Sequence, residues 1–240
     1  MLNIITALSI EAKPIIKKFN LKNQNGIYQN NYINLIITGQ GKLKSAINTA
    51  LLLQKHPYKS LNIGIAGSKT YKKTEGFFIH KITDTDSSLS YYPDFFKENS
   101  SELFCVSKTG KYHILTDMES SGFFEACYKF LSVEEIILYK IVSDTPSQPV
   151  EKNEIPSLIN SHIHIIEKIL DTKTPDFFDD VKELLKEANS KMKLTKTQNE
   201  ELKKMLVFYK LQNKKIPDFP YLKTKKEVRD FLTSLTSSVS

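Results

Sequence analysis

The sequence of 240 residues is long enough for one large domain, or for an average domain with an added segment. A hydrophobic share of 40% and a charged share of 25% are typical of a globular protein, and no apolar run approaches the roughly 20 residues of a membrane-spanning helix. The net charge is +7, but Arg229 is the one arginine among 34 basic residues. Lysine lacks the planar fork with which arginine reads bases and clamps phosphates, so we expect a lysine-solvated surface and no nucleic-acid partner.

Up to about residue 170, short β-branched runs alternate with helical patterns. The apolar runs are mostly continuous, which is typical of strands covered on both faces. Strands are expected at residues 2–8, 33–39, 60–67, 76–83, 102–107, 112–117 and 134–144, and amphipathic helices at 9–19, 43–55 and 119–131. This alternation predicts an α/β fold with a parallel or mixed central sheet, in which ligands bind at the carboxyl ends of the strands.

The pattern changes after Asp171. All eight glycines lie before this point, and residues 172–240 are rich in lysine and helical in pattern. Helices are expected at 177–188, 195–212 and 224–235. The second begins with Thr195 and Gln198 at the spacing of a capping box. We expect two domains, residues 1–171 and an all-helical extension that docks on them; a lysine-rich module for nucleic acid or a partner protein is the alternative.

The N-terminal stretch MLNIITALSIEAKP lacks the basic start of a signal peptide and meets an acid at Glu11, so we expect a cytoplasmic protein. Cys105 and Cys127 are too few for a disulfide scaffold and show no metal-ligand spacing. We therefore expect both cysteines to be reduced, structural thiols, and we expect no metal and no cofactor.

Glu11 follows the first predicted strand. An acid there lies at the carboxyl end of the sheet, where sites form, but the first helical turn also favours an acid through the helix dipole. Two glycine turns end later strands: TGQGK contains Gly39 and Gly41, and NIGIAGS contains Gly64 and Gly67. Such glycines let backbone N–H groups approach a ligand. Neither turn matches a nucleotide-binding motif, so a structural turn explains each equally well.

Two further acidic segments follow. In TDMESSGFFEA, Asp117 and Glu119 flank Met118 where a strand gives way to a helix. A buried carboxylate there can accept hydrogen bonds from the vicinal hydroxyls of a ribose, or it can cap the helix. Asp144 ends the apolar run ILYKIVS. Because burial favours the protonated form of a carboxyl group, an acid here suits general-acid chemistry, and an Asx turn before Pro146 is the alternative.

In this order and at these intervals, the four segments resemble the nucleoside phosphorylase/nucleosidase superfamily, and within it the 5′-methylthioadenosine/S-adenosylhomocysteine nucleosidases. The likeness covers residues 1 to about 170, and its most specific part is the pairing of M-E with S-D. It implies a phosphorylase-like three-layer α/β/α fold with a mixed central sheet. It also implies the site residues, which are catalytic Glu11 and Asp144 and substrate-binding Gly64, Ala66, Gly67, Met118, Glu119 and Ser143.

The resemblance implies hydrolysis of the N-glycosidic bond of an adenine nucleoside, such as 5′-methylthioadenosine, S-adenosylhomocysteine or 5′-deoxyadenosine. In that reaction Asp144 protonates N7 of the leaving base, Glu11 positions the attacking water and Glu119 accepts hydrogen bonds from the ribose, with Met118 against the sugar. Phosphorylases of this superfamily hold phosphate with arginines, and residues 1–171 contain none, which favours water as the acceptor. A homodimer is expected, because relatives often complete the 5′ end of the site from a partner subunit.

Three features depart from the family pattern. Ile65 stands where the family usually has serine, and the helical extension has no counterpart in the typical enzyme. The segment between Ser107 and Asp117 is short, so the usual loop that grips the base is missing. These departures support a rival hypothesis, a nucleoside-binding regulatory protein with little catalysis. A futalosine-type hydrolase is a further alternative, since G-I-A-G loops also occur there.

Overall fold

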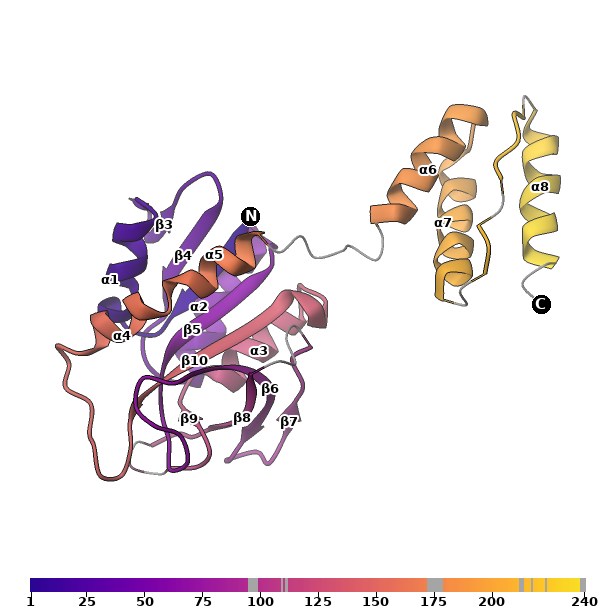
Figure 1. Cartoon of the computed structure of the whole chain (residues 1–240). Helices are drawn as coiled ribbons and strands as arrows, with labels where there is room; N and C mark the ends of the chain where they lie inside the picture. The colour runs from indigo at the N-terminus through magenta and orange to yellow at the C-terminus, as the bar shows by residue number, and fades with distance from the viewer. Residues whose placement is uncertain are drawn as a thin grey trace. The chain divides into compact units, whose positions relative to one another are not determined.

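The computed structural model describes residues 1–94, 99–108, 110, 112–171, 179–211, 214–216, 218–222 and 224–237. The chain divides into two compact units, Met1–Asp171 and Thr172–Ser240. The first unit carries the strands and the helices α1 to α5, and the second carries α6 to α8 (Figure 1).

One mixed sheet runs through the first unit. Its strands are β1 (Leu2–Thr6), β2 (Lys22–Gln24), β3 (Ile27–Gln29), β4 (Ile33–Ile37), β5 (Ser60–Gly67), β6 (Gly76–Asp84), β7 (Ser90–Tyr91), β8 (Ser100–Cys105), β9 (Thr116–Asp117) and β10 (Ile136–Asp144). Their order is β10-β6-β8-β9-β5-β1-β4-β3-β2, with β7 beside β6. Because β10 pairs with both β6 and β5, five strands close into a ring, and β1 to β4 extend from β5. β4, β1, β5 and β10 lie side by side in this order and run parallel to one another.

Helices cover both faces of the sheet. They are α1 (Ser9–Lys18), α2 (Lys42–Lys55), α3 (Ser120–Tyr128), α4 (Ile155–Ser161) and α5 (Ile163–Asp171). One apolar cluster joins α1, α4 and α5 to one face of the sheet, and a second joins α2 and α3 to the other face. Burial on both faces explains why the strand sequences are continuously apolar. The predicted three-layer α/β/α architecture is confirmed.

Three parts of the first unit differ from the prediction. The expected strand at 112–117 is wrong except for its last two residues, because Ser68 Oγ and Lys69 N–H bind the carbonyl groups of Ile114 and His113 and hold this segment as a loop. The β2–β3 hairpin was not predicted, although its Asn25-Gly26 turn is a strong hairpin signal. The helices α4 and α5 were not predicted either.

Both cysteines are buried and free of disulfide bonds, in keeping with structural thiols. Burial raises the pKa of Cys105 to about 12 and also raises the pKa of Cys127. Among the described residues, no helix has the length and apolar character needed to cross a membrane.

The second unit is a helical bundle with its own core. Its helices are α6 (Asp179–Lys191), α7 (Lys196–Leu211) and α8 (Lys225–Ser237). The predicted capping box is confirmed, since Gln198 N–H donates to Thr195 Oγ1 and Thr195 N–H donates to Gln198 Oε1. Residues 177 and 178 of the first expected helix and residue 212 of the second lie outside the described part of the chain.

The apolar side chains of the bundle pack on one another. The buried members of this core are Val181, Leu185, Ala188, Met192, Leu202, Leu206, Phe219, Val228, Leu232 and Leu235. The extension therefore buries much of its apolar surface by itself, and that burial does not require docking on the first unit. Docking itself stays a prediction.

We expect a chain that ends at Asp171 to fold by itself. The buried members of both apolar clusters of the first unit lie within Met1–Asp171, so truncation removes none of them. Thermal unfolding followed by circular dichroism should show a cooperative transition. Its midpoint temperature should be close to that of a transition in the full-length chain. Aggregation or loss of the transition would contradict this expectation, and loss of ligand binding with the fold intact would support docking.

Candidate active site

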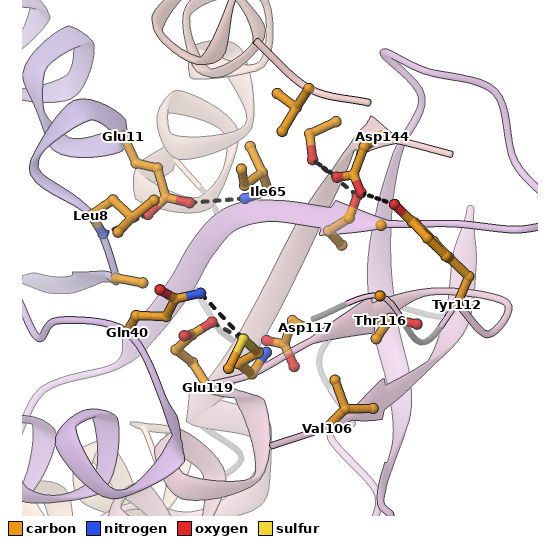
Figure 2. A pocket seen from close by; sticks show the side chains of 17 residues that line it. Leu8, Glu11, Gln40, Ile65, Val106, Tyr112, Thr116, Asp117, Glu119 and Asp144 are labelled. Atoms are coloured by element: carbon orange, nitrogen blue, oxygen red, sulfur yellow. Dashed lines mark hydrogen bonds between the residues drawn. The ribbon is translucent and has the colours of Figure 1, made fainter. Parts of the chain in front are cut away.

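A cavity of about 260 Å³ lies where the carboxyl ends of β1, β5 and β10 meet (Figure 2). Parallel strands bring their carboxyl ends to one edge of a sheet, so residues far apart in sequence meet here. Of the predicted site residues, the cavity is lined by Glu11, Ala66, Gly67, Met118, Glu119, Ser143 and Asp144. Gly64 lies against the Glu11 carboxylate instead. The rest of the lining is Ala7, Leu8, Gln40, Ile65, Val106, Gly110, Tyr112, Thr116, Asp117 and Val150.

Glu11 lies in the first turn of α1 and is 2% exposed. Its Oε2 accepts a hydrogen bond from Leu8 N–H at 2.8 Å, and its Oε1 accepts one from Ile65 N–H at 3.0 Å. Gly64 permits this approach, because a Cβ there would lie 2.8 Å from Glu11 Oε1. Burial raises the pKa of Glu11 against the effect of the two N–H donors. The carboxylate therefore stabilises the helix start and also faces the cavity.

Asp117 and Glu119 make different contacts where β9 gives way to α3. Asp117 binds the first residue of α3, because its carboxylate accepts hydrogen bonds from Ser120 N–H at 3.1 Å and from Ser120 Oγ at 2.6 Å. Glu119 Oε1 accepts a hydrogen bond from Gly41 N–H at 2.7 Å. Gly41 has a φ of +103°, a conformation that favours glycine. This glycine turn therefore presents its amide to a carboxylate of the protein itself.

Lys140 provides positive charge beside these carboxylates. It lies on β10 with 2% of its side chain exposed, and its Nζ is 2.8 Å from Asp117 Oδ2. Burial alone lowers the pKa of Lys140, but attraction to Asp117 and Glu119 outweighs burial, so the pKa is raised. Burial and the Asp117 charge raise the pKa of Glu119 to about 7, against the attraction of Lys140. Glu119 therefore exchanges a proton near neutral pH.

Asp144 ends β10 and is half-buried at the cavity. Its Oδ1 accepts a hydrogen bond from Ser143 Oγ, and its Oδ2 accepts one from Tyr112 Oη at 2.8 Å. Figure 2 shows Glu11 and Asp144 on opposite sides of the cavity. Two carboxyl groups thus face the same space from different elements, one from α1 and one from β10.

Sequence reasoning missed several residues of this site, among them Lys140, Tyr112 and Gln40. Lys140 interrupts the apolar run ILYKIV, and a lysine inside a buried strand requires a charged partner, so this signal was available. Tyr112 lies in the segment wrongly expected to be a strand. Gln40, whose Nε2 donates to Met118 Sδ at 3.2 Å, has no distinguishing sequence signal. In the described ranges, no group of three or more His, Cys, Asp or Glu side chains is arranged to hold a metal ion.

Comparison with known proteins connects this architecture to nucleosidases. No protein-family model and no curated protein matches the sequence. Among solved structures, 5′-methylthioadenosine nucleosidase from Arabidopsis thaliana is 13% identical with a TM-score of 0.62, over 72% of this chain and 96% of that one. A futalosine hydrolase mutant from Helicobacter pylori is 14% identical with a TM-score of 0.59, over 71% of this chain and 98% of that one.

A third solved structure is similar to a comparable extent. It is the 5′-methylthioadenosine/S-adenosylhomocysteine nucleosidase from Helicobacter pylori with butyl-thio-DADMe-Immucillin-A, which is 13% identical with a TM-score of 0.57, over 71% of this chain and 97% of that one. These likenesses show that the chain has the nucleoside phosphorylase-like fold. At such low identity they show the fold alone.

We predict that Lys140→Met destabilises the fold by about 3–5 kcal/mol, because it leaves the Asp117 carboxylate buried without a counter-charge. Urea unfolding of the full chain measures the effect. Lys81→Met is the matched control, since Lys81 pairs with Glu102 at the surface, where an ion pair contributes about 0–1 kcal/mol. Equal losses in the two variants would show that the buried pair has no special role.

Proposed function

We propose that this protein is a purine nucleosidase, an enzyme that hydrolyses the N-glycosidic bond of an adenine nucleoside. The observation that carries the proposal is the meeting of Glu11, Glu119 and Asp144 at one cavity. They come from α1, from the start of α3 and from β10, and they lie where α/β sheets bind ligands. Two carboxyl groups on opposite sides of a cavity, with a third lining the same cavity, suit a reaction at a sugar carbon.

The proposed reaction passes through an oxocarbenium-like transition state. Asp144 gives a proton to N7 of the base, so that the C1′–N9 bond breaks and the base leaves as a neutral molecule. A water held by Glu11 attacks C1′ and gives its proton to that carboxylate. Glu119 accepts hydrogen bonds from the ribose hydroxyls, with Met118 against the sugar. Glu11 and Glu119 must be ionised when they act, whereas Asp144 must be protonated before it acts.

Water is favoured over phosphate as the acceptor. The basic residue next to the Gly41 turn is Lys42, and its Nζ already lies 2.8 Å from Asp84 Oδ2 and 2.6 Å from Asp86 Oδ2. The Gly41 amide is taken by Glu119. An anion that entered here would have to displace these three carboxylates, and residues 1–171 contain no arginine to compensate.

The 5′ substituent of the substrate is a matter for assay. The candidates are 5′-methylthioadenosine, S-adenosylhomocysteine and 5′-deoxyadenosine. A futalosine-type hydrolase is the second candidate function, because the futalosine hydrolase structure matches the fold about as well as the methylthioadenosine nucleosidases do.

The rival hypothesis is a nucleoside-binding regulatory protein with little catalysis, which measured turnover of a nucleoside would exclude. The cytoplasmic location stays a prediction.

We also propose that the protein forms a homodimer. Leu43, Ile47 and Leu51 recur at helical spacing on α2 and are 71%, 51% and 55% exposed. A stripe of exposed apolar side chains is typical of an interaction surface. The resemblance to nucleosidases supports a second copy of this chain as the partner.

We expect the purified protein to release adenine from 5′-methylthioadenosine, S-adenosylhomocysteine or 5′-deoxyadenosine without added phosphate. Chromatography of the free base measures the release. Asp144→Asn should lower the rate about 10²–10⁴-fold, because an amide keeps the shape of the side chain but has no proton to give to N7. Asp171→Asn, at the exposed end of α5, is the control. No base release at high enzyme concentration would reject the enzyme in favour of the binding protein, and a strict need for phosphate would indicate a phosphorylase.

We also expect nucleoside affinity to depend on pH through Glu119. The raised pKa of about 7 means that Glu119 is largely protonated below this pH and accepts hydrogen bonds poorly there, so affinity should fall as pH drops below about 7 and level off above it. Calorimetry on the Asp144→Asn variant measures binding without turnover. Adding Glu119→Gln should weaken binding and remove the pH dependence, whereas adding Glu134→Gln at the exposed surface should change neither. A dependence that survives Glu119→Gln must come from another group.

A further inference from the structure

Tyr112 reaches Asp144 from a different part of the fold. The two residues are 32 positions apart, and the tyrosine Oη donates a hydrogen bond to Asp144 Oδ2 at 2.8 Å. Tyr112 belongs to the segment between β8 and β9 and also lines the cavity (Figure 2). Its contact with Asp144 therefore joins the short loop of this protein to the proposed general acid.

Gly67 makes room for this contact. A Cβ at Gly67 would lie 2.9 Å from Tyr112 Cε1 and 3.1 Å from both Tyr112 Cδ1 and Asp144 Oδ2. Such distances are shorter than ordinary van der Waals contact, so a larger residue would push the ring or the carboxyl group away. The glycine at the end of β5 thus allows the phenol ring and the carboxyl group to pack against the same backbone.

The Asp144 carboxyl group has capacity left after these contacts. Its Oδ1 accepts a hydrogen bond from Ser143 and its Oδ2 accepts one from Tyr112, whereas a carboxyl group offers about four lone-pair positions. Asp144 can therefore keep both donors and still carry a proton toward a base in the cavity.

We propose that Tyr112 is a positioning residue for Asp144, holding its carboxyl group in place and stabilising the carboxylate that forms when the proton passes to the leaving base. This inference rests on the proposed function. The proton moves from Asp144 to N7 of the base, and Tyr112 keeps its own. The hydrogen bond from Tyr112 strengthens as negative charge develops on Asp144, because a bond to an ionised acceptor is about twice as strong as a neutral one. It thus stabilises the transition state more than the bound substrate.

The hydroxyl of Tyr112 stays a donor through neutral pH. The hydrogen bond to Asp144, followed by burial, raises the pKa of Tyr112, so the phenol does not ionise there. The other titratable groups that line the cavity are Glu11, Asp117 and Glu119, with Lys140 beside Asp117. None of these four is altered by replacing Tyr112 with phenylalanine, so a change in the pH profile reports on the lost hydroxyl.

Tyr112→Phe in the full chain tests this role, because it keeps the ring over Gly67 and removes only the hydroxyl. We expect kcat to fall about tenfold with KM nearly unchanged. Without its donor, Asp144 should stay protonated to higher pH, so the basic limb of the pH–rate profile should move to higher pH. Tyr128→Phe, at an exposed position on α3, is the control and should change nothing. In the Asp144→Asn background, Tyr112→Phe should add no further loss.

A second readout separates this inference from the proposed function. The titration of the Asp144 carboxyl carbon, followed by NMR in the wild type and in Tyr112→Phe, needs no turnover and should move to higher pH in the variant. An unchanged kcat, or a loss of kcat with both the pH profile and the NMR titration unmoved, would overturn the positioning role. Absence of base release in the wild type, with the NMR titration still displaced in the variant, would reject the proposed function and the catalytic role together while showing that the contact exists.

Discussion

Lys140 enters the interior of the α/β unit from β10, and its ammonium group lies 2.8 Å from the Asp117 carboxylate with both side chains nearly inaccessible to water. A charge in such a place is tolerated only with a partner, and here each of the two ions is the reason the other can be buried. The Asp117 carboxylate also accepts hydrogen bonds from Ser120 at the start of α3, directly after Glu119. The proton equilibrium of Glu119 near pH 7 follows from the balance between this cation, the neighbouring anion and burial.

The glycines of β5 provide the space into which these groups fit. Gly64 leaves room for the Glu11 carboxylate, and Gly67 leaves room for the ring of Tyr112. Both positions lie on β5, which pairs with β10 at Gly64 and with both β10 and β9 at Gly67. A rigid strand without side chains at two points lets a helix and a loop approach from different directions. The short loop before β9 therefore contributes an aromatic group although it lacks the length of the loop expected in typical nucleosidases.

Much of this architecture could be predicted from local patterns. The continuous apolar runs of β1, β5 and β10 arise from burial on both faces, and their ends place Glu11 and Asp144 at one edge of the sheet. The strand expected at 112–117 was wrong for most of its length. Ser68 and Lys69, which lie in a distant segment of the sequence, donate hydrogen bonds to its backbone carbonyl groups and hold it as a loop. Docking of the helical extension was expected from its many large apolar residues, but most of these residues form a core within the extension itself.

The sequence by itself determined the alternation of strands and helices, the positions of the acids at strand ends, and the lack of arginine in residues 1–171. These follow from periodicity and composition, which are local properties. Only the tertiary structure decided that Asp117 binds Ser120 at the start of α3, that Lys140 neutralises Asp117, and that Tyr112 binds Asp144. Lys140 and Asp117 are 23 positions apart in the sequence, and Tyr112 and Asp144 are 32 positions apart. Closure of the sheet brings them together, and no local pattern encodes which partners then meet.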